Sequence, residues 1–362
     1  MSAKVERLLI TGGGTGGHIH IGIAIAREFL SRGPDHEILF VGTRRGLDSV
    51  LVGAGGFPLE FIEVDALKSI GWARRFRSLL SLPGSVLQSR RILRRFRPGA
   101  VVGVGGYSAG PPALVASWMG IPLVLVEPNS VPGFTNSVLR WWADRVAVQF
   151  QSAAAVFGSK AVRTGIPVRP EFVSLPERRP AGRFAVLVFG GSQGSHVINA
   201  AVTDALPYWK QWGLDLQIRH QTGQRELEMV QQRYRQAGVD ARVEPFIDDM
   251  AAAFAQADLL VCRAGASSLA EIAAARKAAV LIPFAGASDD HQKKNALELV
   301  DQGAAVMLEE KVLSGETLAE QVRSLAQSPQ TVARIGQAAG RHARPDASAR
   351  IVDLIEALGE KP

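Results

Sequence analysis

Short apolar runs bounded by glycine, proline or polar residues recur along the chain, and such runs are typical of buried strands in a parallel sheet. In the first half, strands are predicted at residues 7–11, 37–42, 61–64, 100–105, 123–127 and 145–148. Helical periodicity follows the first of them, over residues 19–30. Strands that alternate with helical segments predict a doubly wound parallel α/β sheet.

The same rhythm restarts in the second half of the chain. Four prolines between residues 165 and 182, clustered with Arg178 and Arg179, predict an inter-domain linker. Beyond it, strands are predicted at 184–189, 216–220, 241–246, 259–262, 280–283 and 305–308, and helices at 318–325 and 351–358. A chain of 362 residues is long enough for two α/β domains. We therefore expect one domain over residues 1–164, a linker over 165–182 and a second domain over 183–362.

Two glycine-rich turns begin these halves, each between a strand and a helix. In the first, Gly12, Gly14 and Gly17 satisfy the G-x-G-x-x-G spacing of dinucleotide-binding turns. The next strand ends at Thr43-Arg44-Arg45 rather than at Asp or Glu, so NAD is not predicted and NADP is only weakly indicated. The alternative is a turn that merely packs a helix on a strand, although glycines do let a ligand approach the backbone.

Residues 258–295 combine a buried strand, a turn of small residues and a helix start. Ser267 and Ser268 stand where a helix leaves backbone N–H groups and hydroxyls free for an anion or a sugar. Glu271, about one turn later, is suited to accept two vicinal hydroxyls, as on a ribose. A capped helix with a solvated glutamate remains the alternative on this window alone.

Composition limits the cellular compartment that is expected for the protein. The single cysteine, Cys262, excludes an internal disulfide and a cysteine-rich metal site, and it fits a reducing cytoplasm. No apolar run reaches membrane-spanning length, and the first residues lack the apolar core of a signal peptide. A soluble protein is expected.

The positive charge is concentrated in one region. Residues 68–97 hold nine basic residues and no acidic one, so the formal net charge of +7 leaves −2 for the rest of the chain. A local cationic face argues against general nucleic-acid binding. An apolar stripe at helical spacing lies beside arginines there and predicts an interfacial membrane contact, unless it packs on the core. The residues of this predicted membrane face are Trp72, Arg74, Arg75, Phe76, Arg77, Leu79 and Leu80.

Seven motifs occur in order across most of the chain: GGGTGGH, VGVGGYSAGP, GIPVR, FGGSQGS, FIDDM, CRAGASSLAEIAAA and DDHQKKNA. Together they resemble the MurG family of peptidoglycan transferases. The resemblance implies the GT-B fold, in which two Rossmann-like domains face each other across a cleft. It also implies an inverting transfer of GlcNAc from UDP-GlcNAc to the MurNAc 4-hydroxyl of lipid I, which gives lipid II. The protein would then work at the cytoplasmic face of the cell membrane, as a peripheral protein on an anionic surface.

The same resemblance implies which residues bind the donor, with the acceptor held mainly by the N-terminal half. On the GlcNAc side of the cleft they are Thr15, Gly16, Gly17 and Asn129. Near the diphosphate they are Arg169 and Ser192, and Ile247 would contact uracil through its backbone. The nucleoside and phosphate would be held by Ala266, Ser267, Ser268, Leu269, Ala270 and Glu271, and sugar hydroxyls by Gln292.

This transfer requires a general base and stabilisation of the departing diphosphate. His18 is the candidate base, because a helix start disfavours the imidazolium and keeps the ring able to accept a proton. A structural histidine is the alternative. No D-x-D motif is present, so neither a metal nor another cofactor is expected. Helix N-termini and Arg169 would carry the leaving group.

Three hypotheses therefore compete. The first is the membrane-surface GlcNAc transferase. The second is another sugar-nucleotide enzyme of the same fold, such as a UDP-sugar epimerase or a soluble-acceptor glycosyltransferase, which would not need a lipid-facing segment. The third is a nucleotide-binding or nucleic-acid-binding module without catalysis, which would bind UDP but turn over no UDP-sugar.

Overall fold

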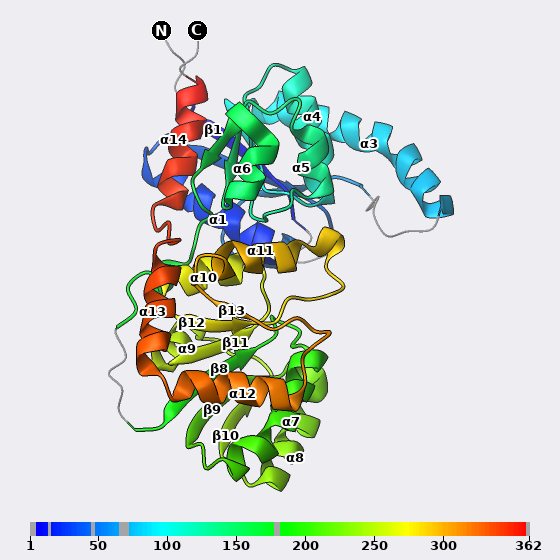
Figure 1. Ribbon diagram of the computed structural model, residues 1–362. Coiled ribbons are helices and arrows are strands. Elements are labelled where there is room, and N and C mark those ends of the chain that lie inside the picture. The colour runs from blue at the N-terminus through cyan, green and yellow to red at the C-terminus, as the bar shows by residue number, and fades with distance from the viewer. Residues whose placement is uncertain (1–4, 14–15, 45–47, 65–71, 177–181, 360–362) are drawn as a thin grey trace. The chain divides into compact units, whose positions relative to one another are not determined.

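The computed structural model describes residues 5–13, 16–44, 48–64, 72–176 and 182–359, with the side chains of helix α3 (Trp72–Phe96) described from Pro83 onward. The chain forms two compact units. The first comprises Met1–Val168 together with Arg344–Pro362, and the second comprises Arg169–Ala343. Figure 1 shows the elements of both.

The first unit is built on a seven-stranded parallel sheet with the order β3-β2-β1-β4-β5-β6-β7. The strands are β1 (Arg7–Thr11), β2 (Glu37–Gly42), β3 (Leu59–Phe61), β4 (Ala100–Gly103), β5 (Leu123–Glu127), β6 (Arg145–Val148) and β7 (Ala161–Arg163). Leu9 of β1 pairs with Leu39 of β2 and with Val101 of β4. The strand order reverses between β1 and β4, and ligands of doubly wound sheets bind beyond the carboxyl ends of the strands at such a point.

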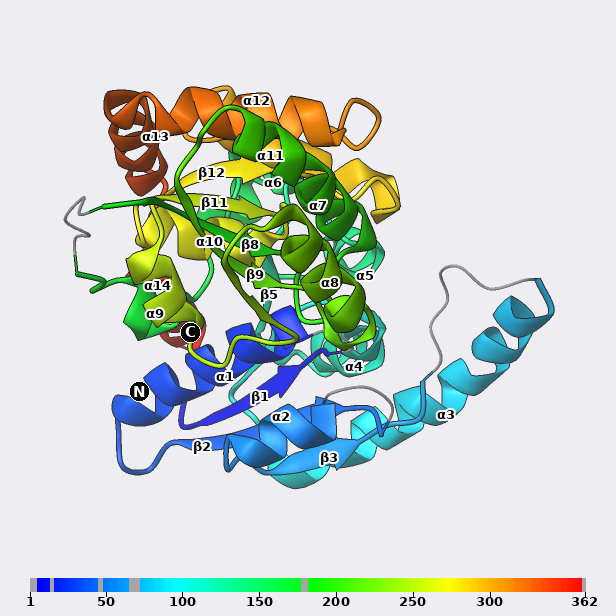
Figure 2. The same ribbon diagram turned by 90° about the horizontal axis from the view of Figure 1, so that it is seen from below.

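Helices cover both faces of this sheet. They are α1 (Gly16–Ser31), α2 (Asp48–Ala54), α3, α4 (Gly110–Trp118), α5 (Phe134–Leu139), α6 (Gln151–Phe157) and α14 (Ala347–Gly359). Apolar residues of α3, α4, α5 and α6 form one core with one face of the sheet. On the opposite face, Gly22 lets α1 approach Phe40 and Ile10 closely. In Figures 1 and 2 the first half of α3 projects away from the rest of this unit.

The second unit has a six-stranded parallel sheet with the order β10-β9-β8-β11-β12-β13. The strands are β8 (Phe184–Phe189), β9 (Leu216–Gln221), β10 (Ala241–Glu244), β11 (Leu259–Cys262), β12 (Ala278–Leu281) and β13 (Val306–Met307). The helices are α7 (His196–Gln211), α8 (Leu227–Ala237), α9 (Met250–Gln256), α10 (Ala266–Ala274), α11 (His291–Val300), α12 (Gly315–Ala326) and α13 (Pro329–Gly340). Trp209 is fully buried in the core of this unit, and its Nε1–H donates to the Ala319 carbonyl oxygen at 3.3 Å, which ties α7 to α12.

Two Rossmann-like units confirm the predicted fold class, but the chain is divided differently from the sequence-based expectation. The predicted second domain ran to residue 362, whereas α14 belongs to the first unit. The physical reason is that Ile351, Val352 and Ile355 are fully buried where α14 packs on α1. The predicted linker, 165–182, is split as well: Ile166 is buried in the first unit, and Phe172 is buried against Phe254 in the second.

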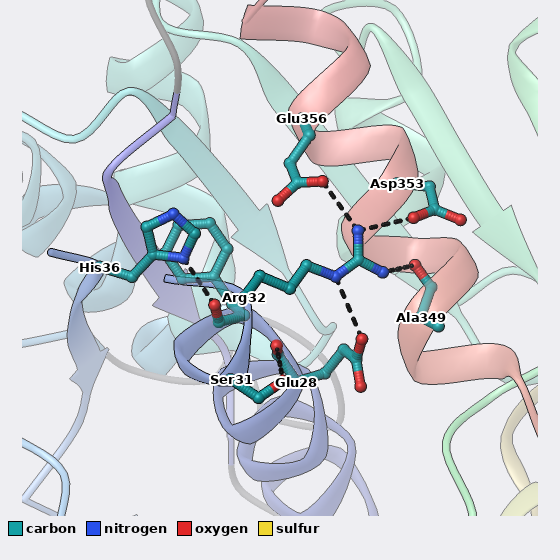
Figure 3. A network of polar contacts seen from close by, with 8 residues as sticks. Glu28, Ser31, Arg32, His36, Ala349, Asp353 and Glu356 are labelled. Carbon is teal, nitrogen blue, oxygen red and sulfur yellow. Dashed lines mark hydrogen bonds and ion pairs between the residues drawn. The ribbon is translucent and has the colours of Figure 1, made fainter. Parts of the chain in front are cut away.

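An arginine fixes the returning helix α14 to α1 (Figure 3). Arg32, directly after α1, donates from Nη1 to Asp353 at 2.6 Å and to Glu356 at 2.7 Å. Its Nη2 donates to the Ala349 carbonyl oxygen at 2.9 Å, and its Nε donates to Glu28 at 3.1 Å. The side chain is only 22% exposed, so these charge-assisted contacts are partly shielded from water.

We expect Arg32→Met, which keeps the aliphatic stem and removes the guanidinium, to destabilise the docking of α14 by about 1–2 kcal/mol. Hydrogen exchange of the α14 amides should accelerate accordingly, with little change in the second unit. Asp353→Asn is the milder comparison, because Asp353 is 62% exposed. Exchange of α14 at the wild-type rate in Arg32→Met would contradict this account of the anchor.

Candidate functional site

The loops at the carboxyl ends of β1 and β4 approach each other closely through glycine backbone. Gly12, Gly105 and Gly106 all have positive φ angles, of 133°, 94° and 81°. The Gly13 N–H donates to the Gly105 carbonyl oxygen at 3.3 Å, and a Cβ on Gly106 would collide with the Gly13 carbonyl oxygen. Any larger residue would push the two loops apart, which explains why both turns are rich in glycine.

His18 lies in the first turn of α1, above this junction. Its Nε2 is 3.2 Å from the position that a Cβ on Gly105 would take, so the ring covers the Gly105 backbone. Gly16 and Gly17 precede it at the start of the helix. Thr15, which the sequence groups with them, is outside the described residues.

A buried carboxylate packs against the backbone of the first glycine turn. Asp48, only 1% exposed, accepts hydrogen bonds on Oδ2 from the Thr43 N–H at 3.0 Å and the Thr43 hydroxyl at 3.3 Å. A Cβ on Gly13 would collide with this carboxylate. The Thr43 hydroxyl is also 3.5 Å from the Tyr107 hydroxyl, so one cluster joins the ends of β2 and β4. Asp48 was not predicted; the available signal was an acidic residue that follows an apolar strand and a turn.

A second buried carboxylate fixes the loop after β5. Glu127 accepts on Oε1 from the Asn129 N–H at 3.0 Å and from Asn129 Nδ2 at 3.4 Å. Its Oε2 accepts from the Gly133 N–H and from Asn136 Nδ2, both at 2.9 Å. Burial raises the pKa of the Glu127 carboxyl, whereas these donors favour its ionised form. The predicted sugar ligand Asn129 is thus held in a fixed loop after β5, the strand next to β4.

The second unit repeats the close approach of glycine backbone. The turn at 190–195 leads into α7, whose N-cap Ser195 accepts the Ile198 N–H at 3.5 Å. A Cβ on Gly194 would collide with the Thr222 carbonyl oxygen, and one on Gly223 would collide with the Gln193 carbonyl oxygen. Gln221 donates from Nε2 to the Gly191 carbonyl oxygen at 3.0 Å. Ser192, predicted near the diphosphate, is exposed at the tip of this turn.

The next strand, β11, leads into α10, whose N-cap is Gly265. Ser267 and Ser268 lie in the first turn and are partly exposed, where helix N–H groups lack acceptors within the helix. The side chains of Ala266, Leu269 and Ala270 are buried. The Leu269 N–H already donates to the Gly265 carbonyl oxygen at 3.0 Å, so the place of Leu269 in the predicted set rests on the motif alone.

Glu271 of α10 binds Arg169, another predicted donor ligand. Arg169 donates from Nη2 at 2.9 Å and from Nε at 3.2 Å, both to Glu271 Oε1. The Glu271 side chain is 17% exposed, and burial raises the pKa of its carboxyl while the Arg169 charge opposes that rise. Two residues predicted for different parts of the donor are therefore in direct contact.

The remaining predicted ligands of the second unit lie on neighbouring segments. Ile247 is buried between β10 and α9, which leaves its backbone as the group that could meet a base. Gln292, at the start of α11, accepts the Phe284 N–H on Oε1 at 3.0 Å. The side chains of the predicted membrane face, residues 72–80, are outside the part of α3 whose side chains are described.

Arg263, which was not predicted to take part, ties two loops of the second unit together; the visible signal was an arginine between a buried strand and a turn of small residues. It pairs with Glu310 at 2.5 Å and donates to the Ile282 carbonyl oxygen at 3.1 Å. Its guanidinium lies 5.3 Å from the centre of the Phe284 ring. Arg263 thereby connects the loops after β11 and β12, which carry the α10 start and Gln292.

A buried histidine is linked by hydrogen bonds to the loop that carries Gly223. His220 is fully buried, with Nε2 3.1 Å from Asn199 Oδ1 and Nδ1 3.1 Å from the Tyr234 hydroxyl. Asn199 donates from Nδ2 to the Thr222 carbonyl oxygen at 3.0 Å and to Glu226 at 2.7 Å. The Asn199 oxygen therefore needs a donor, so His220 carries its proton on Nε2 and accepts from Tyr234 on Nδ1. A neutral ring satisfies every partner.

Two units, each with a Rossmann-like sheet and glycine turns at its carboxyl edge, are the architecture of the GT-B fold, which glycosyltransferases share with other sugar-nucleotide enzymes. Residues 8–148 match the glycosyltransferase family 28 N-terminal domain, and residues 185–351 match the glycosyltransferase family 28 C-terminal domain. Among solved structures, the MurG of Acinetobacter baumannii is similar with a TM-score of 0.83 and 32% identity, over 97% of this chain and 99% of that one.

Curated relatives define the family more narrowly. UDP-N-acetylglucosamine--N-acetylmuramyl-(pentapeptide) pyrophosphoryl-undecaprenol N-acetylglucosamine transferases from Anaeromyxobacter dehalogenans (strain 2CP-1 / ATCC BAA-258) and Geobacter sulfurreducens are 46% and 43% identical. The matches cover 97% and 98% of this chain and 93% and 99% of the relatives. The chain belongs to this family of glycosyltransferases.

A UDP-GlcNAc 2-epimerase from Neisseria meningitidis is also similar, with a TM-score of 0.69. At 9% identity that likeness shows the shared fold alone.

The described residues contain no group of three or more His, Cys, Asp or Glu side chains placed to hold a metal ion.

We predict that His220 makes the fold acid-sensitive. Burial lowers the pKa of His220 from 6.5 to about 3, so between these values the unfolded chain binds one proton more than the folded chain. Folding stability should then fall with acidification, by about 1.4 kcal/mol per pH unit from this residue. His220→Gln keeps a donor and an acceptor but does not titrate, and urea unfolding between pH 4.5 and 6.5 should show a shallower dependence. Parallel pH profiles for the two proteins would contradict the prediction.

Proposed function

We propose that this chain transfers GlcNAc from UDP-GlcNAc to the MurNAc 4-hydroxyl of the lipid-linked acceptor lipid I, with inversion at the sugar carbon. The observation that carries the proposal is full-length similarity, at 43–46% identity, to relatives named as this transferase. The likeness to an epimerase is confined to the fold, and a soluble acceptor has no specific observation in its favour.

The donor is proposed to lie at the carboxyl edge of the second unit. Arg169, Ser192, Ile247, Glu271 and Gln292 all belong to that unit. Ser192 and Ile247 each lie between a strand and the following helix, Glu271 and Gln292 lie in α10 and α11, and Arg169 contacts Glu271. The first turns of α7 and α10 both begin at this edge, and each offers N–H groups without helical acceptors. Together with Arg169 they supply the positive potential that a departing UDP diphosphate needs.

The acceptor and the base are proposed to lie at the carboxyl edge of the first unit. As the 4-hydroxyl oxygen attacks C1 of GlcNAc, His18 takes the hydroxyl proton, the C1–oxygen bond to UDP breaks, and UDP leaves with the bonding electrons. The glycine junction favours this role, because it brings the His18 ring onto bare backbone with no side chain in between. Gly16, Gly17, Asn129 and Thr15 stay predicted sugar contacts.

We expect the wild-type chain to convert radiolabelled UDP-GlcNAc and a short-chain lipid I analogue into a labelled lipid product and UDP in equal amounts. His18→Ala should lose about 10²–10⁴-fold in turnover, the usual contribution of a positioned acid–base group, while UDP affinity stays near wild type. A product that is only an epimerised UDP-sugar would refute the proposed reaction. Turnover that survives in His18→Ala would refute the base alone.

A peripheral contact with an anionic membrane, at the cytoplasmic face, is proposed for the first unit. No helix in the described part of the chain is both long and apolar enough to cross a bilayer. Arg90, Arg91 and Arg94 are exposed on the second half of α3, whereas Ile92 and Leu93 pack into the core. Beside α3, the adjoining helix α4 ends in Trp118, which is 62% exposed. An exposed tryptophan on a helix that packs beside one with exposed arginines is suited to an interfacial contact.

We expect the wild-type protein to sediment with anionic vesicles and to be released as salt rises. Replacing Arg74, Arg75 and Arg77 with Glu should abolish sedimentation and spare UDP binding, because each basic residue adds about 1 kcal/mol of attraction. The matched control replaces Arg233, Arg235 and Arg242 with Glu, an equal change in charge at exposed positions of the second unit. Equal loss in both variants would mean that overall charge, rather than the predicted face, recruits the protein.

A further inference from the structure

The contact between Arg169 and Glu271 joins two residues whose predicted roles concern different parts of the donor. Arg169 is expected at the diphosphate and Glu271 at the ribose, yet Nε and Nη2 of Arg169 both donate to a single oxygen, Glu271 Oε1. The residues are 102 positions apart in the sequence. Both belong to the second unit, so the contact is internal to one compact body.

The geometry leaves part of the carboxylate available. Arg169 uses only Oε1, and the Glu271 side chain retains 17% exposure. A carboxylate with one oxygen fixed has a defined rotamer, and its second oxygen can accept from a vicinal diol. Arg169 thus orients the group that is expected to recognise the ribose.

The arginine is itself held from a second side. Its guanidinium lies 4.6 Å from the centre of the Phe172 ring, and Phe172 is fully buried against Phe254, with ring centres 4.9 Å apart. A guanidinium that stacks on a fixed ring loses little further freedom when it binds a carboxylate. Burial alone raises the pKa of the Glu271 carboxyl, and the Arg169 charge counteracts this, which favours the ionised acceptor.

We propose that Arg169 positions Glu271 for the nucleoside end of the donor, so that it contributes to ribose recognition even where no phosphate is bound. This inference rests on the proposed function, which places UDP-GlcNAc at this edge of the second unit. This role of Arg169 can be distinguished from a direct contact with the diphosphate by using uridine as the ligand. Uridine has the ribose diol but no phosphate, so a loss of uridine affinity cannot come from a lost phosphate contact.

The test compares two ligands by NMR titration of the full-length protein: uridine and 2′,3′-dideoxyuridine, which lacks the diol. We expect Arg169→Gln to weaken uridine binding about tenfold, the scale of one charge-assisted hydrogen bond, and to leave dideoxyuridine binding unchanged. Glu271→Gln should lose the preference for uridine. The double variant should bind uridine no more weakly than Glu271→Gln, because Arg169 acts through Glu271.

Two further variants separate positioning from general effects. Arg169→Lys keeps the charge without the planar fork and should recover part of the uridine affinity. Arg242→Gln breaks another arginine–glutamate pair of the same unit, with Glu244 at 2.8 Å, and should bind uridine as the wild type does. Uridine binding unchanged in Arg169→Gln, with UDP binding weakened, would overturn the inference and leave the donor site standing. A wild-type protein that does not prefer uridine over dideoxyuridine would overturn the ribose role of Glu271 and the inference together.

Discussion

Direct contact between glycine backbones is the constraint on which both candidate edges depend. In the first unit, Gly13 and Gly106 touch where β1 and β4 end, and His18 lies over the neighbouring Gly105. In the second unit, Gly194 and Gly223 bring the loops after β8 and β9 together in the same way. Parallel strands bring their carboxyl ends to one edge, and the absence of side chains lets the loops there approach each other.

Buried polar groups then fix the loops that the glycines bring together. In the first unit, Asp48 and Glu127 accept hydrogen bonds from backbone N–H groups of the loops after β2 and β5. In the second unit, His220 contacts Asn199, which donates to the Thr222 carbonyl oxygen in the loop after β9. An unsatisfied buried donor costs about 1–3 kcal/mol, so a loop that satisfies such donors has few competing conformations. The exposed residues proposed to meet substrate, such as Ser192, are carried by loops whose inner sides are held in place.

Several strands could be predicted closely from the sequence. β1, β2, β5, β6, β8 and β11 have the predicted bounds, because each is an apolar run between clear turn signals. The edge strand β7 was not predicted and β3 starts two residues earlier than expected, since edge strands bury less surface and their apolar pattern is weaker. Two inner strands differ as well: β4 ends two residues early, and β12 begins two residues before its predicted start.

Contacts between residues far apart in the sequence could not be predicted. Helix α14 has the periodicity that the sequence indicated, but nothing local shows that its apolar face packs on α1 and that Arg32 binds it. Ser192, Ile247 and the first residues of α10 follow the carboxyl ends of β8, β10 and β11, whereas Arg169 precedes every strand of its unit. The contact of Arg169 with Glu271 could not be predicted, because each residue was read for its own ligand and they meet only through the fold.

A crystal structure of the protein with bound UDP would test the account most directly. We predict that the uridine lies at the carboxyl edge of the second unit, with the ribose hydroxyls on Glu271, the base at the Ile247 backbone and the diphosphate near Ser192 and Arg169. UDP bound at another edge, or a ribose that makes no contact with Glu271, would contradict it.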